Sequence, residues 1–134
     1  MADIISSARR SRLMSKIRSS NTEPERVVRS HLHRGGLRFR LNARDLPGSP
    51  DIVLPRWRVA IFVHGCFWHR HAGCPYAYTP KSNRSSWKKK FSTNVARDAR
   101  KLAALQQAGW RVYVVWECEL TVGRLNQLMR RVRR

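Results

Sequence analysis

Apolar positions with a helical period mark three segments of the chain. The pattern predicts helices over residues 23–34, from about residue 86 to 108, and over the basic C-terminal segment 120–134. The first begins with a capping-box pattern, because Thr22 stands three residues before Glu25. The expected inward positions of the three helices are Val27, Val28, Leu32, Phe91, Val95, Leu102, Leu105, Leu125, Leu128 and Met129.

Between these helices the period of the apolar positions falls to the two residues typical of strands. Residues 37–41 alternate apolar and basic side chains, which predicts a strand with one solvated face. Residues 51–54 and 58–65 predict a hairpin whose second strand, apolar almost throughout, is buried on both faces. Residues 111–117 predict another buried strand. The order α, β, β, β, α, β, α indicates an α/β domain with a mixed sheet covered by helices.

Two segments fall outside this regular pattern. Residues 1–20 are basic with few apolar positions, and we interpret them as an arm, part of which could form a short helix. Residues 64–86 predict one long irregular loop, and a loop of this length in a small domain is usually functional or anchored. At 134 residues, the chain 1–134 is expected to form a single domain.

Net charge narrows the choice of partner. The chain has 28 Lys and Arg against 8 Asp and Glu, a formal charge of +20 at pH 7. Such a surface favours a polyanionic partner, with nucleic acid as the first candidate. No apolar run approaches the roughly 18 residues of a membrane span, and the polar N-terminus lacks the apolar region of a secretory signal. We therefore expect no membrane partner and a cytoplasmic, nucleoid-associated protein.

Cysteine and histidine cluster in and beside the long loop. Three cysteines cannot form a complete set of disulfides, and Cys66, His71 and Cys74 follow one another at a Cys-x4-His-x2-Cys spacing. Cys118 comes directly after the last predicted strand. Structural zinc takes four sulfur or nitrogen ligands, so these residues predict a structural Zn2+ site that would order the loop. The alternative is three unrelated free cysteines, with histidines on a surface that faces nucleic acid.

Acidic residues are rare in this chain, so each one is informative. Asp51 starts a predicted strand, His64 ends the next, and Glu25 on the first helix could complete a carboxylate pair. Mg2+ prefers oxygen ligands, and phosphodiester hydrolysis needs a metal to activate water and a base to take a proton. The alternative is structural, with Asp51 capping a turn and Glu25 completing the capping box.

Large aromatic side chains stand in the polar loop and at the start of the following helix. Phe67 and Trp68 lie in the loop and Trp87 opens the helix, where flat rings could wedge between base pairs of a nucleic acid. The alternative is that the tryptophans cover the loop. A run of cations follows them and is interpreted as phosphate contacts rather than a solvated face: Lys88, Lys89 and Lys90.

Together these motifs resemble one family. The run SPDIVLPRWRVAIFVHGCFWHRHAGC, followed by W-x6-N-x3-D and GWRVYVVWEC, resembles the very-short-patch-repair (Vsr) DNA mismatch endonucleases, over nearly the whole chain. The resemblance implies a restriction-endonuclease-like fold with a mixed sheet and a zinc site. It implies an enzyme that nicks one strand 5′ to the thymine of a T:G mismatch, which arises when 5-methylcytosine deaminates. We expect a monomer on double-stranded DNA, with repair proteins as further candidate partners.

The resemblance also assigns roles to matched residues. It implies that Asp51 and the backbone carbonyl of Val63 bind catalytic Mg2+; the family often has threonine at this second position, and a carbonyl ligand survives the change. His69 would be the general acid/base. His64 would support the scissile phosphate or the hydrated metal, and Glu25 would assist from the helix.

The matched DNA contacts lie in the loop, the helix after it and the N-terminal arm. Phe67, Trp68 and Trp87 match an aromatic trio that intercalates from the major groove. From the arm, Met14 and Ile17 would brace the minor-groove side. Asn94 and Asp98 match family positions on the helix; Asn94 is counted with the DNA-binding residues, although neither has a firm role.

Three other functions remain as alternatives. A restriction-type enzyme on the same fold would cut both strands, whereas an aromatic trio and a single site favour nicking. A non-catalytic zinc-bearing DNA-binding module would have no need of a carboxylate that repels phosphate. A structural RNA-binding protein would suit the charge but not the run FVHGCFWH.

Overall fold

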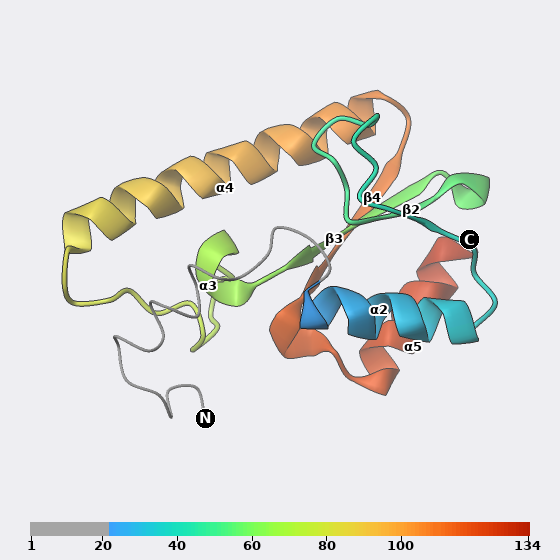
Figure 1. The fold of residues 1–134 in the computed structure, drawn as a ribbon, viewed down its shortest axis with the longest axis horizontal. Helices are drawn as coiled ribbons and strands as arrows, with labels where there is room; N and C mark the ends of the chain where they lie inside the picture. Colours follow the sequence, from blue (N-terminus) through green and yellow to red (C-terminus); the bar gives the residue numbers. More distant parts are fainter. Residues whose placement is uncertain (1–21) are drawn as a thin grey trace.

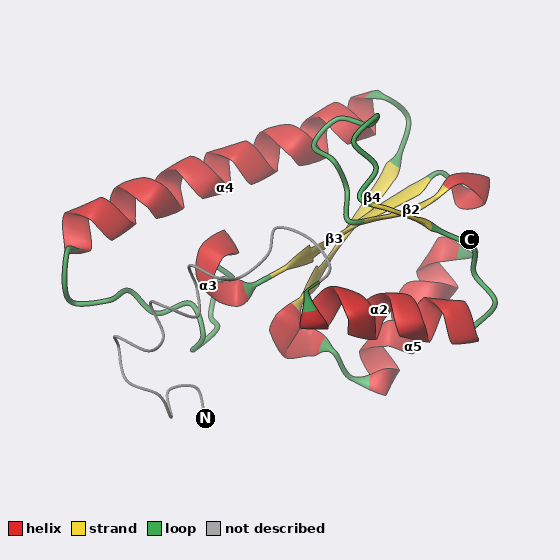
Figure 2. Cartoon of the chain, in the orientation of Figure 1, coloured by secondary structure: helices red, strands yellow, loops and turns green. Residues whose placement is uncertain are grey.

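A four-stranded sheet separates two layers of helices in the computed structural model, which describes residues 22–134 (Figures 1 and 2). The strands, in chain and sheet order, are β1 (Arg40–Leu41), β2 (Ile52–Leu54), β3 (Val59–His64) and β4 (Arg111–Trp116). β1, β2 and β3 pair antiparallel, whereas β3 and β4 pair parallel. This confirms the predicted mixed sheet flanked by helices.

Helices cover both faces of the sheet. α2 (Glu23–Arg34) and α5 (Val122–Val132) lie on one face, and the long α4 (Arg84–Gln107) lies on the other (Figure 1). The short elements are η1 (Pro55–Trp57), α3 (Cys66–His69) and η2 (Glu117–Glu119). No helix within residues 22–134 is long and apolar enough to cross a membrane.

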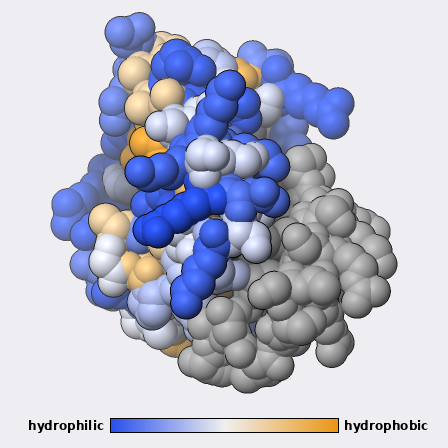
Figure 3. All heavy atoms as spheres, turned by 90° about the vertical axis from the view of Figure 1, so that its left-hand side faces the viewer, coloured by the Kyte–Doolittle hydropathy of each residue, from blue (hydrophilic) through white to orange (hydrophobic). Residues whose placement is uncertain are grey.

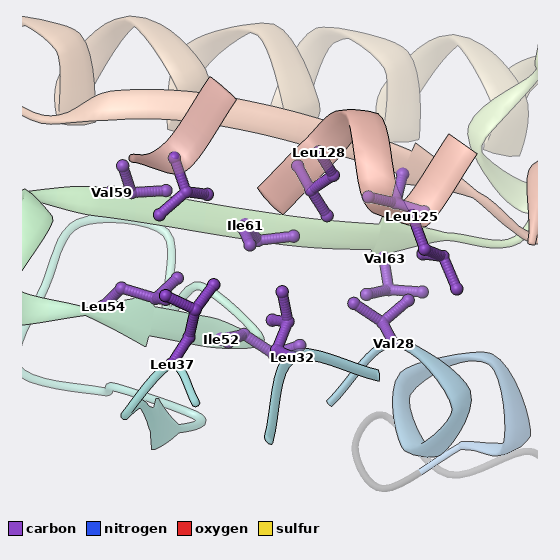
Figure 4. Packing of buried hydrophobic residues seen from close by; sticks show 12 residues of the cluster. Val28, Leu32, Leu37, Ile52, Leu54, Val59, Ile61, Val63, Leu125 and Leu128 are labelled. Atoms are coloured by element: carbon purple, nitrogen blue, oxygen red, sulfur yellow. The ribbon is translucent and has the colours of Figure 1, made fainter. Parts of the chain in front are cut away.

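α2 begins and ends where its sequence predicts. The hydroxyl of Thr22 accepts a hydrogen bond from the N–H of Glu25 at 3.4 Å, which satisfies one of the free donors of the first turn. Gly35 caps the C-terminus. The buried apolar residues of the helix, Val28 and Leu32, pack beneath β3 (Figure 4).

β3 is the centre of the core. All six of its residues are buried, which confirms the prediction of a strand covered on both faces. Because successive side chains alternate, Ile61 and Val63 face α2 and α5, while Phe62 packs on the side of α4. By the same alternation, His64 emerges beneath α4 at the end of the strand, where its ring contacts that of Phe62.

The first predicted strand is shorter than its alternating pattern indicates. Only Arg40 and Leu41 pair with β2. Leu37 is buried, and its N–H donates to the carbonyl of Leu32 at 3.0 Å. The C-terminus of α2 therefore holds Leu37 in the core and out of the sheet.

Three further expectations are corrected by the structure. β4 was expected to be buried, but as an edge strand with one neighbour it buries only Val115. The segment 64–86 is not irregular throughout, because His64 ends β3 and α3 follows it. Val95 was expected on the inward face of α4 but is 46% exposed, because the face at this level is formed by Asn94 and Asp98.

Candidate functional site

Several of the polar residues predicted from the sequence gather where β2 begins and β3 ends. Asp51 directly precedes β2, and the antiparallel register places it beside the end of β3. One carboxylate oxygen of Asp51, Oδ2, accepts a hydrogen bond from the N–H of Val63 at 2.7 Å. The hairpin therefore brings together the two residues expected to bind Mg2+.

The carboxyl group of Asp51 is strongly affected by its surroundings. Its pKa is raised to about 7, mainly by burial and also by the nearby negative charge of Glu25, while the N–H of Val63 and the charge of Lys101 act in the opposite direction. Glu25 is itself only 5% exposed. Two carboxylates that are shielded from water and repel each other are stabilised in their charged form by a cation, and their oxygens are the ligands of hard divalent ions. We call Asp51, Glu25 and Val63 the carboxylate centre.

A second cluster lies beside it and consists of His64, His69 and Asp98. The two imidazole rings stack with centroids 3.8 Å apart and planes 5° from parallel. His69 Nδ1 lies 2.7 Å from Asp98 Oδ2, a hydrogen bond that fixes the orientation of the ring. A base held by a carboxylate is the arrangement that proton transfer requires. We call this set the histidine–aspartate cluster.

His64 and His69 have different surroundings. His64 is 6% exposed, and within residues 22–134 its Nδ1 has no hydrogen-bond partner. Burial, followed by the charge of His69, lowers the pKa of His64 to about 4, so its ring is neutral at pH 7. The ligand atoms of the cluster lie within 4.8 Å of one another and could hold a metal, but His69 Nδ1 is already engaged by Asp98.

Asp98 received no firm role from the sequence, yet it anchors the predicted general acid/base. The sequence feature that could have pointed to Asp98 is its position in the helical period of α4. Counting back from buried Leu105 by seven residues, two helical turns, reaches Asp98 on the inward face of the helix. A carboxylate on a face expected to be apolar is the feature that could have identified it.

The four predicted zinc ligands also come together. Cys66, His71, Cys74 and Cys118 place their ligand atoms within 4.8 Å of one another. The Nδ1 atom of His71 lies 3.6 Å from the sulfur of Cys66 and 3.3 Å from that of Cys118. A tetrahedral zinc with Zn–S of about 2.3 Å and Zn–N of about 2.0 Å would separate nitrogen and sulfur by about 3.5 Å. The arrangement therefore fits a metal ion. We call these four residues the cysteine centre.

Neighbouring groups hold the cysteine centre in place. The ring of His71 stacks on Trp116 with centroids 4.2 Å apart, and its Nε2 lies 3.9 Å from a carboxylate oxygen of Glu119. The N–H of Cys66 donates to Glu117 at 2.9 Å. Burial raises the pKa of the Cys66 thiol, so a bound metal would have to displace a proton there.

The aromatic residues form a connected cluster between α3 and α4. Phe67 is 5% exposed and packs edge-on against Trp68 at 5.2 Å and Trp87 at 5.4 Å between ring centroids. Both tryptophans are half-buried. The guanidinium of Arg70 lies 3.8 Å from the ring centroid of Phe91 and donates to loop carbonyls, including that of Phe67. Phe67 thus supports the tryptophans, and intercalation by the three rings stays a prediction.

The cations at the start of α4 are exposed, as a phosphate-binding role requires. Lys88, Lys89 and Lys90 all face solvent, and hydrophilic residues predominate on the face that holds this end of the molecule (Figure 3). Lys90 Nζ lies 5.0 Å from the ring centroid of Trp87. The side-chain amide of Asn94 donates to the carbonyl of Trp68 at 3.5 Å, so Asn94 contacts α3. Met14 and Ile17 lie outside the described residues.

Comparison with known proteins identifies the family. The model of the family "DNA mismatch endonuclease Vsr" matches residues 2–74, more than half of the chain. The chain belongs to the Vsr family. It is a DNA endonuclease, a hydrolase that cleaves phosphodiester bonds, and it takes DNA as its substrate.

Relatives of known activity match most of this chain. The chain is 53% identical over 133 residues to the type II nicking enzyme V.XorIIP of Xanthomonas oryzae pv. oryzae, covering 98% of this chain and 97% of that protein. It is 43% identical over 120 residues to the DNA mismatch endonuclease Vsr of Escherichia coli, covering 90% and 76%. It is 41% identical to the nicking enzyme V.NmeAIP of Neisseria meningitidis, covering 99% and 98%.

Proposed function

We propose that this endonuclease nicks one strand of duplex DNA 5′ to the thymine of a T:G mismatch, in a Mg2+-dependent reaction. Such mismatches arise by deamination of 5-methylcytosine, and the nick would start very short patch repair. The observation that carries the proposal is the adjacency of the carboxylate centre and the histidine–aspartate cluster at one end of β3. Together they offer the two parts that phosphodiester hydrolysis needs, a site for a hard cation and an oriented proton-transfer group.

The carboxylate centre would hold the catalytic ion. Asp51 and the backbone carbonyl of Val63 are the proposed ligands, and Glu25 assists from α2. Bound Mg2+ would activate a water molecule and neutralise the charge that develops on the phosphate. The half-buried position of Asp51 near the buried Glu25 supports this assignment, because a cation relieves both the desolvation and the mutual repulsion of the carboxylates.

The histidine–aspartate cluster would transfer the proton. His69 is the proposed general acid/base, since Asp98 fixes its ring and leaves Nε2 for the reaction. His64 stacks on His69 and is neutral at pH 7, so it would support the phosphate or the hydrated metal by hydrogen bonding.

The cysteine centre is proposed to bind structural Zn2+. Its four donors leave no position for a substrate, as is usual for structural zinc. Cys66 opens α3, the helix that ends with His69. A bound ion would therefore tie the helix that carries the general acid/base to Cys118, beyond the end of β4.

Mismatch recognition is proposed to lie where the aromatic residues of α3 pack against the first turn of α4. Trp68 and Trp87, supported by Phe67, would stack beside the opened base pair, because a mismatched step costs less to open than a paired one. The exposed lysines that follow Trp87 would bind phosphates, and Met14 and Ile17 would brace the minor groove.

A cleavage assay on a denaturing gel tests the proposal. End-labelled duplexes that differ in one base pair, T:G, T:A or C:G, are incubated with the full chain, with and without Mg2+. We expect one nick beside the thymine of T:G, and only with Mg2+. Equal cutting of all three duplexes, or cleavage of both strands, would favour a restriction-type enzyme. Tight binding without any cut would leave a DNA-binding module.

A further inference from the structure

The inward face of α4 carries a lysine that none of the proposed roles uses. Lys101 follows Asp98 by three residues and precedes Leu105 by four, so it shares the helix face that covers the active site. Lys101 is half-buried, whereas its neighbours Arg97 and Arg100 are exposed. A lysine side chain rarely points inward unless its ammonium group reaches water or a polar partner.

The stem of Lys101 lies against the loop that leads to Asp51. A Cβ atom added to Gly48 would lie 2.7 Å from Lys101 Cβ and 2.8 Å from Cγ, so the stem occupies the space of a side chain at this position. Gly48 also has a φ of +74°, which favours glycine. The contact therefore fixes Lys101 against the loop three residues before the proposed metal ligand.

The charge of Lys101 reaches both parts of the active site. Its positive charge interacts electrostatically with Asp51 and with His64. Within residues 22–134, Lys101 makes no hydrogen bond or ion pair, so its ammonium keeps its donors for a ligand. An anion is the ligand that best matches the positive charge and the three N–H donors of an ammonium group.

A phosphodiester entering this site needs such a cation. The carboxylates of half-buried Asp51 and buried Glu25 repel a phosphate wherever the bound metal does not neutralise them. The lysines at the start of α4 stand at least ten residues from Lys101 along the helix, about 15 Å at a rise of about 1.5 Å per residue. They can contact flanking phosphates but not the phosphate at Asp51.

We propose that the Lys101 ammonium binds a non-bridging oxygen of the scissile phosphate and positions that phosphate against the carboxylate centre. This inference rests on the proposed nicking function. It adds a substrate-positioning residue to the site and places the phosphate between the start of β2 and the inward face of α4.

Three variants of the full chain test the proposal. Lys101→Met keeps an unbranched stem against Gly48 but removes the charge, and Lys101→Arg restores a cation. Arg100→Gln is the control, because it removes one exposed charge from the adjacent position on α4. We expect Lys101→Met to lower the single-turnover nicking rate about 10- to 100-fold, as expected for loss of one charge-assisted contact. Lys101→Arg should recover much of the rate, and Arg100→Gln should keep it.

A binding experiment separates phosphate contact from a merely structural role. A T:G duplex with a neutral methylphosphonate at the scissile position is bound without Mg2+ beside the unmodified duplex. We expect the neutral linkage to weaken binding of the wild type, and to weaken binding of Lys101→Met much less, because the contact is already absent. Equal weakening in both proteins, or a wild-type nicking rate in Lys101→Met, would overturn the assignment while the nicking function stands. Failure of the wild type to nick T:G would overturn the proposed function, and this inference with it.

Discussion

The carboxylate centre and the cysteine centre lie at the same end of the sheet, but they are built differently. The cysteine centre gathers four side-chain donors, and two outer carboxylates and a stacked tryptophan hold them. The carboxylate centre has few donors, and burial raises the pKa of Asp51 to about 7. A closed set of soft ligands suits a structural ion, whereas an incomplete set of oxygens leaves room for water and substrate. The difference fits the proposed division of roles, in which the cysteine centre would stabilise the fold and the carboxylate centre would perform the chemistry.

α3 joins the two centres. It begins with Cys66 of the cysteine centre and ends with His69 of the histidine–aspartate cluster. Four residues are about one helical turn, so a shift of the metal ligand moves the proposed acid/base directly. We therefore expect changes in the cysteine centre to impair both stability and activity, and changes in the carboxylate centre to impair activity alone.

The largest loss of stability and activity should come from removing one of the four donors of the cysteine centre. Cys118→Ser replaces the most exposed of its ligands, and we expect bound zinc to be lost and Tm to fall by about 10 °C or more, with nicking abolished. Elemental analysis and thermal unfolding measure the two quantities. His33→Ala, which removes an exposed histidine outside the centre, should change neither. Retention of a full zinc equivalent with an unchanged Tm would show that Cys118 is not a ligand.

The opposite result is expected for the carboxylate centre. Asp51→Asn should lower the nicking rate by about 1000-fold or more, because a neutral amide cannot hold the ion in place of the carboxylate. Zinc content should stay at the wild-type level, and Tm should not fall, since a buried ionisable group has been replaced by a neutral one. Asp45→Asn removes an exposed carboxylate and serves as the control. A loss of folding equal to that of Cys118→Ser would abolish the distinction between the two centres.

Smaller losses of nicking rate should distinguish His69, the proposed proton-transfer residue, from Asp98, which orients its ring. We expect His69→Ala to slow nicking about 100-fold or more and Asp98→Asn about 10- to 100-fold, since the asparagine orients the ring less well. Asp98→Asn should add little to His69→Ala, because the two residues act as one unit. Single-turnover rates of the two single variants and the double variant measure the coupling. Fully additive losses would mean that Asp98 acts without His69.

The smallest effect is a pH dependence of ion binding. The pKa of Asp51 is raised to about 7, so below pH 7 Mg2+ must displace a proton and its half-saturating concentration should rise towards tenfold per pH unit. Above pH 7 that concentration should level off. Without a bound cation, the raised pKa also means that stability declines as pH rises from about 4 through 7, because the folded protein then loses a proton that the unfolded chain has already lost. Mg2+ titrations of the nicking rate at pH 6, 7 and 8 test the first expectation. A half-saturating concentration that is constant over this range would contradict it.

The sequence predicted the parts of this molecule that depend on local pattern. The period of α2, the capping residue Thr22 and the apolar run of β3 were each sufficient to place an element. The spacing of the cysteine centre likewise predicted a cluster that the structure confirms. These features are encoded within a few residues of one another, or by a rare residue type.

The remaining features depend on contacts between distant segments. Whether β4 is buried depends on its position at the edge of the sheet, which its own apolar residues do not reveal. Asp98 contacts His69 only because α4 passes over α3, and the proposed role of Lys101 depends on its stem packing against Gly48. The predicted roles of the aromatic trio and the arm concern DNA, and they stay predictions.

Anomalous diffraction from crystals of the chain would test the central claim most directly. Crystals grown with zinc and soaked in Mn2+, in place of Mg2+, would be measured at the absorption edges of both metals. We predict zinc bound by Cys66, His71, Cys74 and Cys118, and manganese beside Asp51 and Val63. Either metal bound between His64, His69 and Asp98 would contradict the account, because the proposed proton-transfer group would then be a metal site.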